Sequence, residues 1–310
     1  MIKRTLYFGN PAYLKTANEQ LVVETPLPVP VQGEDGEEIN TTSKTIPIED
    51  IGLLIIDHRQ VTITQAVLSK LLANNTAVIT CDDTHHPTGM MLSLDGHSLQ
   101  AQKFTAQVNA TQPLKKQLWQ QTVAAKIKNQ AAMLAFRRTE NKILLSLAEN
   151  VKSGDSENAE AQAAAYYWKR VFPEDLDFRR ERYGPPPNNL LNYGYAILRA
   201  MVARSLVASG MLPTLGIHHR NQYNAYCLAD DVMEPYRPYV DYVVFQLVRQ
   251  NGQYLDMNPA MKKALLEVPA MDVMIDGKKS PMMNAVQRTT ASLAKCFEGT
   301  ARKILYPEFQ

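Results

Sequence analysis

The sequence predicts an α+β protein: a small β-rich N-terminal domain followed by a larger all-α domain. Over the first 85 residues, apolar residues form short runs or alternate with polar ones, as in strands; beyond residue 95 they recur at helical spacing. The length of 310 residues exceeds what one hydrophobic core usually organises, which favours two domains. We expect these domains at residues 1–85 and 96–310, joined by a linker at 86–95.

The first domain is expected to hold strands at 4–8, 21–24, 44–48, 51–57 and 76–81. A turn is expected at Gly33-Glu34-Asp35-Gly36. Thr64 can cap a short helix whose apolar residues share one face. The polar, turn-rich segment 82–89 places the domain boundary.

In the second domain, apolar residues at helical spacing predict a helix through 114–131, and the pattern continues at 142–147. Residues 152–156 interrupt it. A helix is expected from 157 to 170, with Asp155 or Ser156 as its cap. Three consecutive prolines at 185–187 then stop the chain before a long helix at 188–209, which Gly210 closes.

The composition excludes several classes of protein. An apolar content of 45% with mixed charges is too high for a disordered chain. The three cysteines (Cys81, Cys227 and Cys296) are far apart and odd in number, so they form neither a disulfide framework nor a zinc cage. The first residues lack the apolar core of a signal peptide, and the run 53–56 is too short to cross a bilayer. We therefore expect a cytoplasmic protein.

The net charge of +2 conceals an asymmetry. Residues 1–100 carry 6 basic and 12 acidic side chains, whereas residues 101–204 carry 16 basic and 9 acidic ones. A basic middle segment suits contacts with a polyanion, although solvated helix surfaces are often rich in Lys and Arg. The candidate contacts to a DNA backbone are Lys126, Lys128, Arg137, Arg138, Arg179, Arg180 and Arg182.

Three short segments carry residues suited to chemistry. Glu160 lies in the first turns of a predicted helix, where it can equally complement the helix dipole. His218 and His219 follow an apolar segment and could present an imidazole to a site, or lie on the surface. Asp231 and Glu234 are one helical turn apart, so their charges repel unless a cation neutralises them.

The third segment has two further interpretations. Asp231 and Glu234 could form a capping-box-like helix start, or Arg237 could pair with Glu234 across one turn. Pro235 cannot donate a backbone hydrogen bond, which favours an early-helix or kinked position. Taken together, two carboxylates and one imidazole suit Mg²⁺ or Mn²⁺, because oxygen ligands dominate. Such an ion can polarise a phosphoryl oxygen and activate a hydroxyl nucleophile.

At these residues the sequence resembles the CRISPR-associated protein one family, the integrase subunit of the spacer-acquisition machinery, and its type II members in particular. The similarity lies in the order and spacing of several segments. They are Ile55–Arg59, Pro113–Ala131, Gly154–Phe172, Leu191–Arg199, Leu228–Asp241, Pro281–Gly299 and Tyr306–Phe309.

The resemblance implies the site and the fold. The family binds its divalent metal through a Glu, a His and a second acid, which correspond to Glu160, His219 and Glu234, with Asp231 as a possible helper. These three would be both the catalytic and the metal-binding residues. The resemblance further implies a homodimer formed through the β domain and a helical domain that holds the metal.

The resemblance also implies an activity and partners. The activity is that of a metal-dependent DNA endonuclease and integrase, in which a 3′-hydroxyl of a short duplex, the protospacer, attacks a phosphodiester at the CRISPR repeat. The partners are double-stranded DNA and the small CRISPR-associated protein two, in a complex of two dimers bridged by a partner dimer.

Two other functions stay open. A DNA-binding scaffold without chemistry would use the basic middle segment alone and would bind DNA equally well in a chelator. A zinc hydrolase built on His218, His219 and Glu234 is less favoured, because zinc prefers more imidazole or thiolate ligands than this set offers.

Overall fold

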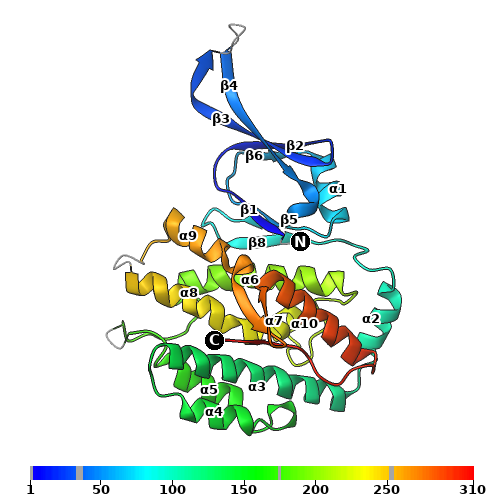
Figure 1. Cartoon of the computed structure of the whole chain (residues 1–310), viewed down its shortest axis with the longest axis vertical. Helices are drawn as coiled ribbons and strands as arrows, with labels where there is room; N and C mark the ends of the chain where they lie inside the picture. The colour runs from blue at the N-terminus through cyan, green and yellow to red at the C-terminus, as the bar shows by residue number, and fades with distance from the viewer. Residues whose placement is uncertain (1–2, 33–37, 174–175, 251–254) are drawn as a thin grey trace. The chain divides into compact units, whose positions relative to one another are not determined.

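The computed structural model describes residues 3–32, 38–173, 176–250 and 255–310. The chain divides into two compact units, residues 1–96 and 97–310 (Figure 1). The predicted turn at 33–36 lies outside the described residues. Within the described part, no helix combines the length and the apolar character needed to span a membrane. The three cysteines are free thiols.

In the described part of the first unit there are two four-stranded sheets, the helix α1 and a short 3-10 helix, η1 (Ile48–Asp50). One sheet has the order β1-β5-β7-β8 and the other the order β4-β3-β2-β6. In the first sheet, β1, β5 and β7 are parallel and β8 runs antiparallel to β7. The elements are β1 (Arg4–Phe8), β2 (Ala12–Ala17), β3 (Gln20–Gln32), β4 (Glu38–Pro47), β5 (Ile51–Ile56), β6 (Val61–Ile63), α1 (Gln65–Ala73), β7 (Ala77–Cys81) and β8 (Pro87–Met91).

The core of the first unit explains these elements. β5 is a continuous apolar run and is buried on both faces, as expected of a central parallel strand. Val67 and Leu71, one turn apart on α1, are fully buried in the same cluster as Leu14, Leu21 and Leu54. The predicted helical face is therefore confirmed.

The linker expected at 86–95 is not found there. Residues 87–91 form β8, which pairs with β7 so that Met90 lies opposite Ile79 and Met91 opposite Val78. The polar segment before it is a tight turn, closed by a hydrogen bond from Asp82 N to His86 O (2.9 Å). Turn-forming residues thus mark a hairpin here, and the first unit extends to Gly96.

The second unit is mainly helical, which confirms the predicted fold class. The prediction that this unit is all-α is wrong, because it also contains a three-stranded sheet of order β10-β9-β11. Its elements are α2 (Gln100–Val108), α3 (Gln112–Phe136), α4 (Lys142–Glu149), η2 (Ser153–Asp155), α5 (Ala159–Trp168), α6 (Asn188–Ala208), α7 (Cys227–Met233), η4 (Glu234–Tyr236), α8 (Arg237–Gln250), α9 (Pro259–Leu266), η5 (Val268–Ala270), β9 (Asp272–Ile275), β10 (Lys278–Pro281), α10 (Met282–Phe297) and β11 (Pro307–Glu308).

Helix α3 is the long element against which the functional segments pack. Thr111 caps it by accepting a hydrogen bond from Leu114 N (3.4 Å), and Pro113 occupies its first turn. Leu118, Val123 and Ile127, at the predicted spacing, are fully buried. Helix α3 contacts η2, α5, η4 and α8, and Figure 1 shows it running alongside α5.

Candidate functional site

Glu160, His219 and Glu234 come from three separate segments of the second unit. Glu160 is the second residue of α5, His219 lies in the loop that precedes α7, and Glu234 lies where α7 meets η4. Glu160 and Glu234 meet Lys126 near the middle of α3, and the His219 ring lies beside Trp119, two turns earlier on the same helix. The fold therefore brings the sequence-predicted site residues into one region.

The position of Glu160 is fixed by the turn before its helix. The carboxylate of Asp155 accepts hydrogen bonds from the backbone N–H groups of Ala159 (2.8 Å) and Glu160 (3.1 Å). These N–H groups have no partner within the helix, so the buried Asp155 caps it, as predicted. The cap holds the backbone from which the Glu160 side chain extends.

The loop that carries His219 is organised by Asp231. Its fully buried carboxylate accepts hydrogen bonds from Ile217 N (2.6 Å), His218 N (2.9 Å) and His219 N (3.3 Å). A Cβ atom on Gly216 would lie 2.4 Å from the His219 carbonyl oxygen, so the loop requires glycine there. The loop therefore wraps tightly around one carboxylate.

Asp231 also binds the His219 side chain. Its Oδ1 lies 2.5 Å from His219 Nδ1, and this hydrogen bond, assisted by the nearby charges of Glu234 and Glu160, raises the pKa of His219. A carboxylate at Nδ1 favours the tautomer whose Nε2 carries a free lone pair. The structure therefore orients His219 with Nε2 available as a ligand.

Glu234 is buried and sits between two cations. Arg237 Nε donates to Oε1 of Glu234 (2.8 Å), which confirms the one-turn ion pair considered from the sequence. Lys126 Nζ lies 2.6 Å from Oε2. Burial opposes the ionisation of Glu234, but the charges of Arg237 and Lys126 outweigh it and lower the pKa of Glu234 to about 2.

Lys126 joins the two carboxylates. Its Nζ is also 2.6 Å from Oε1 of Glu160, so one ammonium bridges Glu160 and Glu234. Burial alone would lower the pKa of Lys126, but the two negative charges outweigh it and raise that pKa. Lys126 is thus buried beside the site rather than displayed on the surface for DNA.

The remaining basic candidates fall into two groups. Arg137 donates to the carbonyl oxygens of Arg170 and Phe172, and Arg180 donates to the side-chain oxygens of Asn188 and Asn192 (2.8 Å each). These two guanidinium groups are engaged within the protein. The others are exposed: Lys128, Arg138, Arg179 and Arg182.

The side chains of Glu160, His219 and Glu234 offer the oxygen and nitrogen ligands that suit a hard divalent cation, but they do not converge on one point. Among the residues that the structure describes, no three His, Cys, Asp or Glu side chains converge closely enough to hold an ion. Instead, the Lys126 ammonium supplies a positive charge between the two carboxylates. Oε2 of Glu234, although 2.6 Å from that ammonium, is buried and receives no hydrogen bond of normal geometry from a described residue. A metal that binds this oxygen would therefore have to share or replace the contact with Lys126.

His218 is not part of this arrangement. Its ring stacks on Trp119, with centroids 4.3 Å apart and planes 5° apart, and is nearly perpendicular to the His219 ring. The described residues therefore give no three-ligand zinc site from His218, His219 and Glu234. The geometry favours His219 as the imidazole of the site.

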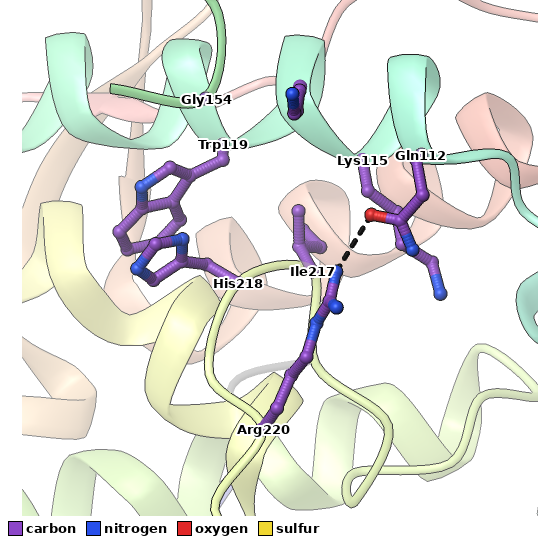
Figure 2. Close-up of a pocket in the computed structure, with 8 residues that line it drawn as sticks. Gln112, Lys115, Trp119, Gly154, Ile217, His218 and Arg220 are labelled. Atoms are coloured by element: carbon purple, nitrogen blue, oxygen red, sulfur yellow. Dashed lines mark hydrogen bonds between the residues drawn. The ribbon is translucent and has the colours of Figure 1, made fainter. Parts of the chain in front are cut away.

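The sequence interpretation missed several residues around the site. Gln112, Lys115, Lys116 and Trp119 line a cavity with residues of the 216–220 loop (Figure 2). Their spacing of three and four residues places them on one face of a helix, and Lys126 continues that face seven residues after Trp119. That periodicity was a detectable signal for polar residues along one face.

Comparisons with known proteins agree with this architecture. Residues 6–271 match the family model described as "CRISPR associated protein Cas1". The chain is 36% identical over 316 residues to the CRISPR-associated endonuclease Cas1 of Neisseria meningitidis serogroup C (strain 8013), covering 99% of this chain and 97% of the relative.

Solved structures share the fold at lower sequence identity. A casposase bound to integration product superposes with a TM-score of 0.76 at 20% identity, covering 98% of this chain and 92% of that one. A Cas6-RT-Cas1–Cas2 complex gives a TM-score of 0.72 at 19% identity, covering 100% of this chain and 37% of the matched chain.

Proposed function

The chain belongs to the Cas1 family of CRISPR-associated proteins, and on that premise we propose that it is a metal-dependent DNA endonuclease and integrase of CRISPR adaptation. The observation that carries the proposal is the meeting of Glu160 and Glu234 on a single cation, the Lys126 ammonium, beside an oriented His219. Its metal ligands would be Glu160, His219 and Glu234, and its metal Mg²⁺ or Mn²⁺.

The ligand chemistry supports a hard metal. Two carboxylates and one imidazole provide more oxygen than nitrogen, the balance that Mg²⁺ and Mn²⁺ prefer over Zn²⁺. Glu234 stays ionised because its pKa is low, so it does not need to lose a proton before it binds a cation. The bound ion would neutralise charge that develops on the phosphate during displacement.

The reaction itself needs no energy source. The oxygen of a 3′-hydroxyl loses its proton and forms a bond to phosphorus, while the bond from phosphorus to the departing 3′-oxygen breaks and that oxygen takes up a proton, so one phosphodiester replaces another. The protein has to hold the attacking 3′-oxygen in line with the P–O bond that breaks and exclude competing water. Asp231 contributes by fixing the 217–219 backbone and the His219 ring together. Arg237 and Lys126 contribute positive charge beside Glu234, the most buried of the proposed ligands.

The proposed partners are double-stranded DNA, as protospacer and as repeat, and the small Cas2 protein. The fold shared with a casposase bound to integration product and with a chain of a Cas1–Cas2 assembly supports these partners. A homodimer formed through the first unit, and two such dimers bridged by a Cas2 dimer, complete the proposed assembly.

The test measures whether the protein joins a labelled duplex with free 3′-hydroxyl ends to a supercoiled plasmid that carries the repeat. The protein and its Cas2 partner are incubated in Mn²⁺ or in chelator, beside the variants Glu160→Ala and His219→Ala. Glu157→Gln is the matched control, because Glu157 is an exposed carboxylate three residues before Glu160. We expect joined label only in Mn²⁺, and only with the wild type and the control.

Other outcomes separate the alternatives. Plasmid that is bound equally in Mn²⁺ and in chelator but never joined would support the DNA-binding scaffold. Joining that persists in His219→Ala would exclude His219 as a ligand. Stoichiometric zinc in protein purified without added metal would return zinc chemistry to consideration.

A further inference from the structure

The loop that carries His219 is bound at two places, and the proposed function accounts for only one of them. This loop, residues 209–226 between α6 and α7, contains neither helix nor strand. Asp231 binds its backbone at residues 217–219. Nearer its start, the loop is bound by Gln107 of α2, a residue far earlier in the chain.

The carboxamide of Gln107 forms three hydrogen bonds with the backbone of this loop. Its Nε2 donates to the carbonyl oxygens of Leu212 (2.9 Å) and Leu215 (3.0 Å), and its Oε1 accepts from Leu212 N (2.9 Å). Both amide protons are used, and the partners define which end is nitrogen, because two carbonyl oxygens need donors and one N–H needs an acceptor. Gln107 is 1% exposed, so water competes little for these hydrogen bonds.

The side chains of the loop do little to fix its path. Thr214 and Leu215 are exposed, and so are His218 and His219, whereas Ile217 between these pairs is buried. A segment with few buried apolar contacts depends on its backbone hydrogen bonds and opens easily when they are lost. The three hydrogen bonds from Gln107 are therefore expected to determine where this part of the loop lies.

Helix α2 is itself held firmly. A helix of nine residues is not stable alone in water, so its position depends on tertiary contacts. It packs against α10 (Figure 1), and its Lys103 forms a largely buried ion pair with Glu298, at the end of α10 (2.8 Å). The start of the loop lies directly on α2, because a Cβ atom at Gly210 would be 2.6 Å from the Lys103 side chain.

The contacts of Asp231 alone leave the turn at 217–219 one degree of freedom. All of them converge on a single carboxylate, so the turn could pivot about that group. Leu215 is only four residues before His219, and the tight turn at Gly216 lies between them. Attachment of Leu215 to Gln107 therefore gives the turn a second fixed point and prevents the pivot.

We propose that Gln107 is a positioning residue for His219, because it holds the loop so that Nε2 of His219 is placed for the metal. The inference rests on the proposed function, since it takes His219 as a metal ligand. Removing an outer partner of a metal ligand typically lowers metal affinity by about 10- to 100-fold. Gln107 acts through the loop and not on the ring itself, so we expect a loss of about 10-fold.

The test compares substitutions on α2. Gln107→Met keeps the length of the side chain and removes its three hydrogen bonds. Gln102→Met is the matched control, because Gln102 is an exposed glutamine of the same helix. Lys103→Met removes the ion pair with Glu298 but no hydrogen bond to the loop, so it shows the effect of loosening α2 alone. Gln107→Asn, with an amide one CH₂ shorter, is the milder variant if Gln107→Met does not fold.

The first measurement needs no metal. The ring of His218, adjacent to the proposed ligand, stacks on Trp119 with centroids 4.3 Å apart, so the emission of Trp119 reports the position of the loop. It is recorded in a Trp168→Phe background, which leaves Trp119 as the protein's one tryptophan. We expect changed emission in Gln107→Met, a smaller change in Gln107→Asn, and wild-type emission in both controls. Wild-type emission in the Gln107 variants would overturn the inference.

The second measurement is Mn²⁺ affinity by isothermal titration calorimetry, together with the joining assay. We expect the affinity of Gln107→Met to fall about 10-fold and the Mn²⁺ concentration for half-maximal joining to rise by the same factor. The joining rate at saturating Mn²⁺ should stay near that of the wild type, because the bound metal then holds His219 in place. Both controls should behave as the wild type.

Two outcomes would be decisive against these proposals. Equal losses of Mn²⁺ affinity in Gln107→Met and Lys103→Met would give Gln107 a general role in stability and overturn the inference. Wild-type protein that binds no Mn²⁺ would remove the proposed function, whereas the emission of Trp119 would still decide whether Gln107 positions the loop.

Discussion

Lys126 Nζ lies 2.6 Å from Oε2 of Glu234, in a buried contact that gives the candidate metal site a cation of its own. The same ammonium reaches Glu160. Two carboxylates this close would repel each other if nothing neutralised them, and taking them out of water adds a desolvation cost. Lys126 therefore holds the site together, and a metal would have to share or replace its contacts.

Lys126→Met should destabilise the metal-free protein by about 3 kcal/mol, because breaking a buried ion pair leaves uncompensated charge. Added Mn²⁺ should raise the melting temperature of this variant more than that of the wild type, since the ion supplies the missing charge. Urea denaturation without metal measures the loss of stability, and thermal melts with and without Mn²⁺ measure the change in melting temperature. Lys128→Met, two residues along α3 and exposed, is the control and should change stability by less than about 0.5 kcal/mol. Equal stability of Lys126→Met and the wild type would contradict the bridging role.

Asp231→Asn should lower the affinity for Mn²⁺ by about 10- to 100-fold, because the Asp231 carboxylate binds and orients the ring of His219, a proposed metal ligand. The substitution would weaken the hydrogen bond to His219 Nδ1 and the hydrogen bonds that the Asp231 carboxylate accepts from the backbone N–H groups of residues 217–219. Isothermal titration calorimetry gives the affinity. Asp230→Asn is the matched control, because Asp230 binds Arg199 and Asn224 instead. Similar losses in both variants would show that general folding, not His219, is responsible.

Asp155→Asn should cost about 1 kcal/mol of stability by weakening the cap of α5. Asparagine keeps one acceptor oxygen and tolerates the positive φ of 54° found at this residue. Because the cap fixes the backbone at Glu160, we also expect weaker Mn²⁺ binding. Ser156→Ala, one residue later and exposed, provides the comparison. Chemical denaturation measures the stability, and an unchanged value for Asp155→Asn would exclude the capping role.

Local sequence signals were sufficient for the long elements. Helices α3 and α6 were predictable because their apolar spacing, caps and breakers all lie within the segments themselves, as with Gly210 at φ +72° after α6. Strands β8 to β11 were not, because each is five residues or shorter and is stabilised by a partner strand. A similar limitation explains why the linker expected at 86–95 was not found there. The same turn-forming residue types occur in hairpin turns and in linkers between domains.

The site was predictable in its residue types but not in its contacts. The helical face that Lys126 shares with Trp119 separates it from the exposed Lys128, but its burial could not be predicted, because it depends on Glu160 and Glu234 arriving from distant segments. Arg180 and Arg182 likewise look equivalent in the sequence. The structure separates them, since Arg180 binds Asn188 and Asn192 of α6 whereas Arg182 is exposed.

That difference predicts opposite results for two neighbouring substitutions. Arg180→Gln should lower stability by about 1 to 3 kcal/mol, because it leaves the side-chain oxygens of Asn188 and Asn192 without their charged donor. Arg182→Gln should leave stability within about 0.5 kcal/mol and instead weaken duplex DNA binding, with a shallower salt dependence. Thermal melts and anisotropy titrations test the pair, and a stable Arg180→Gln with impaired DNA binding would reverse the assignment.

Asp241 provides a pH-dependent prediction away from the metal site. It is 1% exposed and accepts hydrogen bonds from Tyr195 and Tyr167 (2.9 Å for Tyr167). Burial raises the pKa of Asp241 to about 6, although both hydrogen bonds oppose the rise. The folded state then holds this proton more tightly than the unfolded state, whose carboxyl has a pKa near 3.9.

The sign follows from that difference. The stability that protonation of Asp241 contributes is fully present below about pH 4 and is lost as the pH rises through about 6. Asp241→Asn removes the titrating group at nearly constant volume. The free energy of unfolding of the wild type, minus that of Asp241→Asn, should therefore increase when the pH is lowered from 7.5 to 5. Urea denaturation at the two pH values measures this difference, and a difference that decreases on acidification would show that Asp241 has a lowered pKa.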